Sequence, residues 1–242
     1  MPTHQLIFGA GRPFGAESCT IPTLEFLTRA KAAGMAAAEI DIDTMAEPAC
    51  RDAVAASGLI PVVRLPRAPR GPAVDNAPDA TPARGGKARK TGPFSAGPDV
   101  ECLRWARSVG ATMAVADGDA LEEPAIWNWS TMARNAGLTL VAAEYIDPEE
   151  EDGLEPSLDA MFEVTRDIDV SEDPMPSGIR LGAGEPIEGG DLMMIAVALA
   201  DWRRFNRAGT SLLALIDPDG PSTTANMESI RTVWKQGVPD VA

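Results

Sequence analysis

The chain has 242 residues, and apolar side chains make up 45% of them, which is enough to bury a full core as one large domain spanning residues 1–242. The net charge of −15 repels nucleic acid and anionic lipid at long range, so a nucleic-acid-binding function is excluded. No apolar run reaches the roughly 18 residues that a membrane-spanning helix needs, so no contact with a membrane is expected.

Seven apolar, strand-like segments alternate with seven helix-like segments. The predicted strands are Leu6–Gly9, Ala36–Ile42, Leu59–Leu65, Thr112–Ala116, Leu138–Ile146, Gly178–Gly182 and Thr210–Ile216. The predicted helices are Thr23–Ala33, Glu47–Ser57, Val100–Val109, Pro124–Asn135, Ser157–Asp167, Asp191–Arg207 and Thr223–Gln236. The strands are continuous apolar runs, which is typical of a parallel sheet covered on both faces. The alternation therefore predicts an α/β fold built from repeated β/α units.

The two kinds of connection in this pattern differ in length. Five helix-to-strand joints are short, and each has a glycine where a left-handed helix C-cap is expected: Gly34, Gly58, Gly110, Gly137 and Gly209. The strand-to-helix connections are longer and hold most of the proline and charge. Because all such connections lie on one side of a parallel β/α fold, ligand binding is predicted at the carboxyl ends of the strands.

One of these connections, residues 67–98, has six prolines, five glycines, six basic residues and only two acids in an otherwise acidic chain. A long segment of this kind is either a lid over the site or a disordered insertion, and both alternatives are open. As a lid, its charge would predict an anionic ligand, whether phosphate, carboxylate or phenolate. The acidic segment 147–156 is either a solvated turn or a partner that pairs with this lid.

Three strand motifs resemble the xylose isomerase-like TIM barrels, the superfamily of sugar-phosphate isomerases and epimerases. Asn135–Glu144 resembles the fifth strand of the family, Gly178–Glu185 the sixth and Ser211–Asp217 the seventh, and Glu39 fits the family's second-strand glutamate. The resemblance implies a (β/α) barrel with helices outside. It also implies metal-binding or functional carboxylates at Glu39, Glu144 and Asp217.

The chain departs from the family in its histidines and in its length. His4 is the single histidine, and Arg64, Glu185 and either Leu215 or Asp217 stand at the family's histidine positions. No cofactor is therefore expected, although carboxylates alone could still hold Mg²⁺ or Mn²⁺. Only Gly237–Ala242 follows the last helix, so the eighth β/α unit is predicted to be truncated or missing. A stub of strand at Val238–Val241, a differently closed barrel or a partner subunit in a homo-oligomer could fill its place.

Carboxylates at strand ends are the candidate acids and bases. Glu144 ends an apolar strand, where partial desolvation would suit a general base. Glu39 and Asp41 alternate along the second strand with Asp43, so they share one face, and Asp43 is expected to cap the following helix. Asp217 is a further candidate, with a turn-forming role as its alternative.

The candidate substrate-binding residues follow the same strands. Arg64 and Arg180 lie in apolar surroundings, where each needs a substrate anion or a carboxylate such as Glu39 as its partner. The remaining candidates are Arg12, Glu185, Tyr145 and Asp117. Strand alternation predicts that Tyr145 points away from Glu144, which leaves packing as its alternative role. The segment Gly9–Phe14 lacks the third glycine of a dinucleotide-binding loop, so a nucleotide cofactor is excluded.

These residues predict an isomerase, epimerase or lyase that moves a proton next to a carbonyl in a small, polyoxygenated, anionic substrate. Glu144 would be the base, Glu39 or Asp217 the second acid/base, and Arg64 and Arg12 would stabilise the enolate. The alternative is a non-catalytic protein of the same fold that binds a ligand or a partner chain. Three widely spaced cysteines and the absence of a signal-peptide pattern predict a cytoplasmic protein with reduced thiols.

Overall fold

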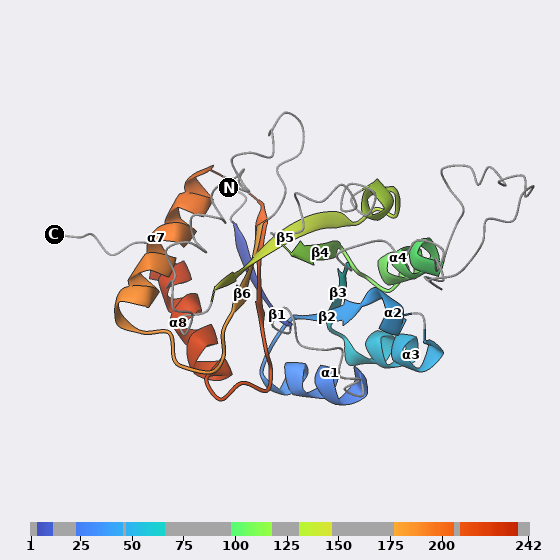
Figure 1. Ribbon diagram of the computed structural model, residues 1–242, viewed down its shortest axis with the longest axis horizontal. Coiled ribbons are helices and arrows are strands. Elements are labelled where there is room, and N and C mark those ends of the chain that lie inside the picture. The colour runs from blue at the N-terminus through green and yellow to red at the C-terminus, as the bar shows by residue number, and fades with distance from the viewer. Residues whose placement is uncertain are drawn as a thin grey trace, which may run out of the picture.

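The computed structural model describes residues 4–11, 23–45, 47–65, 98–117, 131–146, 177–205 and 209–236. Seven parallel strands run around a closed barrel in chain order (Figure 1). The strands are β1 (Gln5–Ala10), β2 (Ala37–Asp41), β3 (Ile60–Arg64), β4 (Met113–Asp117), β5 (Thr139–Ile146), β6 (Ser177–Leu181) and β7 (Ser211–Ile216). The prediction of a barrel of parallel β/α units is confirmed.

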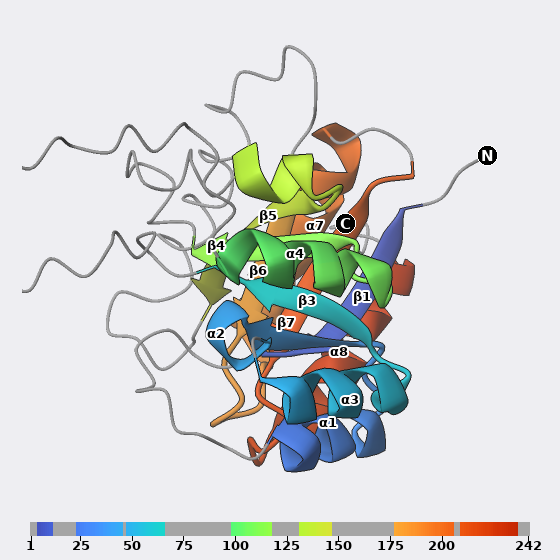
Figure 2. The same ribbon diagram turned by 90° about the vertical axis from the view of Figure 1, so that its right-hand side faces the viewer.

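The helices lie outside this barrel, as Figure 2 shows for α1, α3 and α4. They are α1 (Thr23–Ala32), α2 (Ile42–Met45), α3 (Pro48–Ser57), α4 (Pro98–Ser108), α7 (Gly189–Phe205) and α8 (Thr223–Gln236). Residues 131–135 are also helical. The predicted helix Ser157–Asp167 and the segments 67–97 and 147–156 lie outside the described residues, so the lid hypothesis stays a prediction.

The barrel closes with seven strands rather than eight. β7 pairs directly with β1 over the full length of both strands, from Gln5 opposite Ser211 to Ala10 opposite Ile216. The predicted absence of a normal eighth unit therefore leaves no gap between the described strands for a partner subunit to fill. Val238–Val241 lies outside the described residues, and a homo-oligomer stays a prediction.

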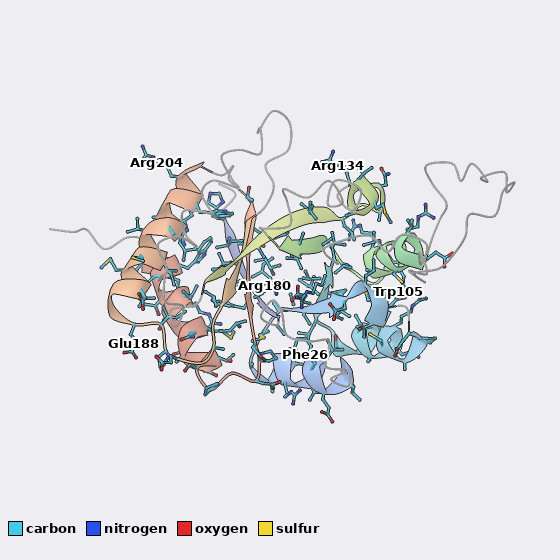
Figure 3. The ribbon with its side chains drawn as sticks, viewed as in Figure 1. Phe26, Trp105, Arg134, Arg180, Glu188 and Arg204 are labelled. Carbon is cyan, nitrogen blue, oxygen red and sulfur yellow. The ribbon has the colours of Figure 1, made fainter. Side chains whose placement is uncertain are left out.

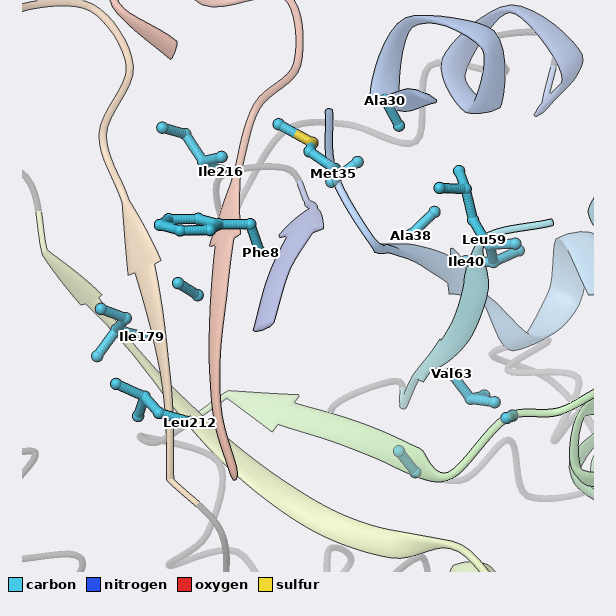
Figure 4. Close-up of a cluster of buried hydrophobic side chains, with 14 of the residues drawn as sticks. Phe8, Ala30, Met35, Ala38, Ile40, Leu59, Val63, Ile179, Leu212 and Ile216 are labelled. Carbon is cyan, nitrogen blue, oxygen red and sulfur yellow. The ribbon is translucent and has the colours of Figure 1, made fainter. Parts of the chain in front are cut away.

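Successive side chains along each strand point to opposite faces of the sheet, so two apolar clusters form, one inside the barrel and one outside it. The inner cluster fills the barrel and consists of Ala37, Val62, Met113, Val115, Val141, Ala143, Leu213 and Leu215. The outer cluster lies between the strands and the helices, and part of it is drawn in Figure 4, with Ala38, Ile40 and Leu59 gathered in one place. Membership of one cluster or the other therefore tells which face of the sheet a strand position occupies.

The glycine joints confirm how the helices end. Gly34, Gly58, Gly110 and Gly137 follow described helices with positive φ angles, as predicted for left-handed C-caps, and Gly209 also has a positive φ angle. The first turn of α3 begins with Pro48, and the preceding residue Glu47 occupies the N-cap without a side-chain hydrogen bond. The expectation that Asp43 caps this helix is wrong, because residues 42–45 form the short helix α2 and Asp43 lies within it.

Aromatic side chains pack together beside the start of β1, where Trp202 is part of the outer cluster and Trp234 packs against it. The His4 ring meets Trp202 edge-on at 5.4 Å between centroids, and Trp202 lies 6.0 Å from Trp234. The Arg203 guanidinium stacks 3.9 Å from the Trp234 ring centroid, and partial burial lowers its pKa. His4 is thus a packing residue at the start of β1. None of the described helices is both long and apolar enough to cross a membrane.

Candidate active site

Two charged side chains enter the apolar interior of the barrel near the carboxyl ends of the strands. Glu39 stands opposite Val62 in the register of β2 and β3, and Arg180 stands opposite Leu215 in that of β6 and β7. Because Val62 and Leu215 belong to the inner cluster, Glu39 and Arg180 share its face. Figure 3 shows Arg180 in the middle of the barrel.

Glu39 and Arg180 form a bidentate ion pair across the barrel. The Arg180 Nη1 donates to Glu39 Oε2 at 2.7 Å, and Nη2 donates to Oε1. Only 2% of the Arg180 side chain and 3% of the Glu39 side chain are exposed. Parallel N–H···O bonds of this kind are among the strongest polar contacts in proteins. The partner of Arg180 in the structure is thus the carboxylate of Glu39, one of the alternatives left open by the sequence, and a role of Arg180 in substrate binding stays a prediction.

Arg64 and Asp41 extend this pair toward solvent. They stand opposite each other in β3 and β2, and the Arg64 Nε lies 3.8 Å from Asp41 Oδ1 and 4.0 Å from Glu39 Oε1. Exposure rises to 20% for the Arg64 side chain and 53% for that of Asp41. We call Glu39, Asp41, Arg64 and Arg180 the charged cluster. Of its four members, Arg64 and Asp41 are the two whose side chains reach the surface.

Gly11 provides the space that the buried pair needs. A Cβ at this position would stand 2.8 Å from the Leu215 Cβ, 3.0 Å from Glu39 Oε2 and 3.1 Å from Arg180 Nη1. The Gly11 amide is fixed by a 3.0 Å hydrogen bond to the Ile216 carbonyl oxygen, so the backbone cannot simply move away. A glycine directly after β1 therefore indicates that another group packs closely there. The sequence alone does not show that this group is the Glu39–Arg180 pair.

We expect Gly11→Ala to lower the free energy of unfolding by roughly 1–3 kcal/mol, because overpacking forces neighbouring groups to shift. Urea unfolding followed by circular dichroism measures the change. Gly190→Ala is the matched control, since a Cβ there meets nothing within 4 Å and lies in the first turn of α7. If the two variants are equally stable, the Glu39–Arg180 pair does not need the space beside Gly11.

A buried asparagine fastens the loop that follows β6, the strand of Arg180. Asn226 of α8 is fully buried, and its Oδ1 accepts a hydrogen bond from the Ile187 amide at 2.8 Å. Its Nδ2 donates to the carbonyl oxygens of Gly182 at 2.8 Å and Glu185 at 3.0 Å. The connection that follows β6 is thus held to α8. Sequence analysis missed Asn226, although it shares the buried face of α8 with Thr223, Met227 and Ile230.

Two sequence-predicted site residues lie in the loops that follow β6 and β7. Glu185 is exposed, and its backbone carbonyl rather than its carboxylate makes the contact with Asn226. Asp217 follows β7, and its Oδ1 accepts a hydrogen bond from the Asp219 amide at 2.9 Å, which is a turn-forming contact. None of the described contacts joins Asp217 or Glu185 to the charged cluster, and their catalytic and binding roles stay predictions.

Four further candidates lie wholly or partly outside the described residues: Arg12, and the side chains of Asp117, Glu144 and Tyr145. The backbone register still distinguishes two of them. Tyr145 stands opposite Arg180, whereas Glu144 stands opposite Ile179, a member of the outer cluster. The role of Tyr145 in substrate binding stays a prediction. The role of Glu144 as a base stays a prediction.

The charged cluster does not fit a divalent metal at Glu39. Both carboxylate oxygens of Glu39 accept hydrogen bonds from Arg180, and a second guanidinium, that of Arg64, lies 4.0 Å away. A cation placed there would compete with two positive charges for one carboxylate. In the described part of the chain, no three His, Cys, Asp or Glu side chains gather into a metal-binding group.

The chain matches no protein-family model, and no curated protein is similar to it in sequence. It is similar in structure to 3-dehydroquinate dehydratase from Geobacillus kaustophilus HTA426, with a TM-score of 0.50, 12% identity and coverage of 97% of this chain and 90% of that one. It is also similar to an uncharacterised protein from Parabacteroides distasonis ATCC 8503, with a TM-score of 0.51, 11% identity and coverage of 94% and 98%.

A third similar structure is octameric ribulose-1,5-bisphosphate carboxylase/oxygenase from Pyrococcus horikoshii OT3, with a TM-score of 0.51 and 8% identity. The match covers 97% of this chain and 60% of that one. Because identities this low carry no information about individual site residues, these likenesses concern the fold alone. The chain is a parallel β/α barrel of the TIM type.

Proposed function

We propose that the chain is an enzyme of the isomerase, epimerase or lyase type that transfers a proton next to a carbonyl of a small, polyoxygenated anion. The charged cluster is the observation that carries this proposal. Membership of the xylose isomerase-like superfamily is part of it and rests on the three strand motifs and on Glu39.

The cost of burying charge supports a functional role for the cluster. A hydrophobic pair of similar volume usually stabilises a core as well as a buried ion pair does, so Glu39 and Arg180 are not needed for stability alone. They lie at the end of the barrel where enzymes of this fold carry their sites. Arg64 and Asp41 continue the cluster to solvent, so a ligand can reach their charges. The buried pair of Glu39 and Arg180 fixes the positions of these charges from inside the barrel.

Each member of the cluster has a distinct part in the proposed reaction. Arg64 would hold the anionic group or the developing enolate oxygen, because a positioned guanidinium stabilises negative charge as it forms. Asp41 would take the proton, because it is the exposed carboxylate beside Arg64. Glu39 and Arg180 would keep Arg64 in place. Glu144 is the second candidate base, predicted from the sequence, and the test below separates it from Asp41.

Proton transfer next to a carbonyl leaves a deuterium label at that carbon when the reaction runs in D₂O. We expect the wild-type protein to exchange the proton in at least one member of a panel of hydroxy acids, keto acids and sugar phosphates, followed by proton NMR. Asp41→Asn should slow this exchange by about 100-fold or more, since removal of a general base has effects of this size. Arg64→Met should slow it as well.

The controls use exposed residues of the same kinds on the outer helices. Asp52→Asn on α3 and Arg104→Met on α4 should leave the exchange rate unchanged, because both side chains lie outside the barrel. If Glu144→Gln abolishes exchange and Asp41→Asn does not, the base is Glu144. If no substrate in the panel is labelled by the wild-type protein, the proposed function is wrong.

One observation favours the non-catalytic alternative. Both oxygens of Glu39 are engaged by Arg180, so this carboxylate does not act as a second acid or base in the described arrangement. A protein that only binds a ligand or a partner chain would retain such a pair and lack isotope exchange. Ligand binding without exchange in the assay above would identify this case.

A further inference from the structure

We propose that the outward face of α7 is the surface through which two copies of this chain form a symmetric dimer. This helix lies on the outside of the barrel (Figure 1), and the inference does not depend on the proposed function. It rests on the apolar side chains that α7 exposes and on the charges at the two ends of the helix.

The exposed face of α7 is apolar along the middle of the helix. Met193 and Val197 are 43% and 44% exposed, and because they are four residues apart they lie on one face. Ile195 and Leu199 are turned to the opposite side, where they are buried in the outer cluster. Residues 192–200 contain no charged side chain. A helix that is apolar on its outward side as well as on its buried side is typical of one that is covered on both sides.

The other long helices that the structure describes differ from α7 in this respect. Each carries a charged residue on its exposed side: Glu25 on α1, Asp52 on α3, Arg104 on α4 and Glu228 on α8. Leu24 of α1 is more exposed than Met193, but it lies beside Glu25. Single exposed apolar residues are common on protein surfaces, whereas a contiguous apolar strip marks a contact surface.

The charges at the ends of α7 favour a second copy of this chain as the partner. Glu188 is exposed just before the helix and Asp191 lies in its first turn, whereas Arg204 is exposed in its last turn. Figure 3 shows Glu188 and Arg204 at opposite ends of α7. A surface that is acidic, then apolar, then basic along its length is complementary to itself when a two-fold axis reverses its direction. A second copy therefore supplies the reversed pattern without any other partner.

An antiparallel pair of α7 helices brings these groups together. If Met193 of one copy faces Val197 of the other, Glu188 stands level with Trp202 of the other copy, about two residues or roughly 3 Å from Arg204 along the axis. Exposed ion pairs contribute little binding energy, so the end charges set the direction of packing and the apolar contact supplies the affinity.

The dimer is expected to be weak and reversible. A standard interface engages roughly 20–30 residues on each partner, whereas the whole of α7 has 17 residues. Contacts of this limited size are typical of transient complexes, so we expect a dissociation constant of about 10–100 µM.

Sedimentation velocity at protein concentrations that bracket this range tests the proposal. We expect the wild-type protein to pass from monomer to dimer as its concentration rises. Val197→Glu should raise the dissociation constant more than about tenfold, because it buries a charge in an apolar contact. Leu24→Glu is the matched control, since it places the same charge at another exposed apolar position and should leave the dissociation constant unchanged. Circular dichroism verifies that both variants keep the fold.

Charge reversal and added salt test the direction and the origin of the contact. Glu188→Arg and Arg204→Glu should each weaken the dimer, and the double variant should restore it, because the two residues then meet with their signs exchanged. The net charge of −15 on each copy opposes self-association at low ionic strength, so added sodium chloride should strengthen an apolar contact.

A protein that stays monomeric over the whole concentration range overturns the proposal. A dimer that is disrupted by Leu24→Glu and not by Val197→Glu does so as well, because the contact then lies elsewhere. A double charge reversal no better than the single variants overturns the antiparallel arrangement. None of these outcomes depends on isotope exchange, which tests the proposed function alone.

Discussion

Replacing Arg180 by methionine is expected to lower the free energy of unfolding by about 3–5 kcal/mol, because the change leaves Glu39 buried without its cation. The side chain of Glu39 is only 3% exposed, so water cannot replace the two lost hydrogen bonds without entering the barrel. Urea unfolding at equilibrium, followed by circular dichroism, measures the loss. The reciprocal change Glu39→Leu should destabilise by a comparable amount, because it removes the carboxylate that accepts two hydrogen bonds from the buried guanidinium.

The double variant Glu39→Leu/Arg180→Met separates the coupling energy between the two residues from the free-energy cost of burying their charges. Apolar residues that replace both partners of a buried ion pair are often neutral or stabilising, so the double variant should regain most of the lost stability. Arg64→Met is the control for loss of one guanidinium from the cluster, and it should cost less because Arg64 is partly exposed. Additive losses in the double variant would contradict a direct coupling between the two residues.

Recovery of stability in the double variant would also bear on function. If an apolar pair maintains the barrel as well as Glu39 and Arg180 do, stability does not explain why two charges occupy its interior. Glu39 and Arg180 lie deeper in the barrel than Arg64 and Asp41. This position supports the role of fixed charges that orient the ligand site. A double variant that folds, yet no longer exchanges deuterium into a substrate of the panel, would demonstrate this role.

The barrel could be predicted because its signals are local. Each glycine that ends a helix, such as Gly34 or Gly137, marks a joint in the sequence without knowledge of the rest of the chain. Continuous apolar runs then identify buried parallel strands between these joints. The short helix α2 was missed because four residues are too few to show a helical period and its first residue extends the apolar run of β2.

The sequence offered both Arg64 and Arg180 as partners of Glu39 and could not choose Arg180, because Glu39 and Arg180 are 141 residues apart and lie on strands that are not neighbours. Adjacent parallel strands can be aligned from the sequence, so Arg64 on β3 was the natural candidate partner of Glu39 on β2. Contacts across a barrel depend instead on the number of strands and their stagger. Closure with seven strands changes both the strand number and the stagger, and the sequence left this closure as one of several alternatives.

Side-chain direction in β5 was likewise hidden. The run from Thr139 to Ile146 is apolar on both faces, so its pattern alone does not tell which positions enter the barrel. The structure adds the backbone register with β6, which sets Tyr145 opposite Arg180 and Glu144 opposite Ile179. Pairing information of this kind is needed before either residue is assigned to chemistry.

Removing the amide of Asn226 is expected to cost about 3–4 kcal/mol of unfolding free energy, at roughly 1–3 kcal/mol for each buried group left without a partner. Asn226→Ala leaves the Ile187 amide and the Gly182 carbonyl buried and unbonded, and it releases the Glu185 carbonyl. Urea unfolding measures the global effect. Amide hydrogen exchange at Ile187 measures the local one and should become markedly faster.

Two further variants test whether the hydrogen bonds of Asn226, rather than its volume, hold the loop that follows β6. Asn226→Asp keeps the shape and the acceptor for Ile187 but cannot donate to Gly182, so it should be nearly as unstable as the alanine variant. Asn135→Ala, at an exposed position, should change stability by no more than about 0.5 kcal/mol. An aspartate variant as stable as the wild-type protein would show that the volume of Asn226, rather than its donated hydrogen bonds, holds this loop.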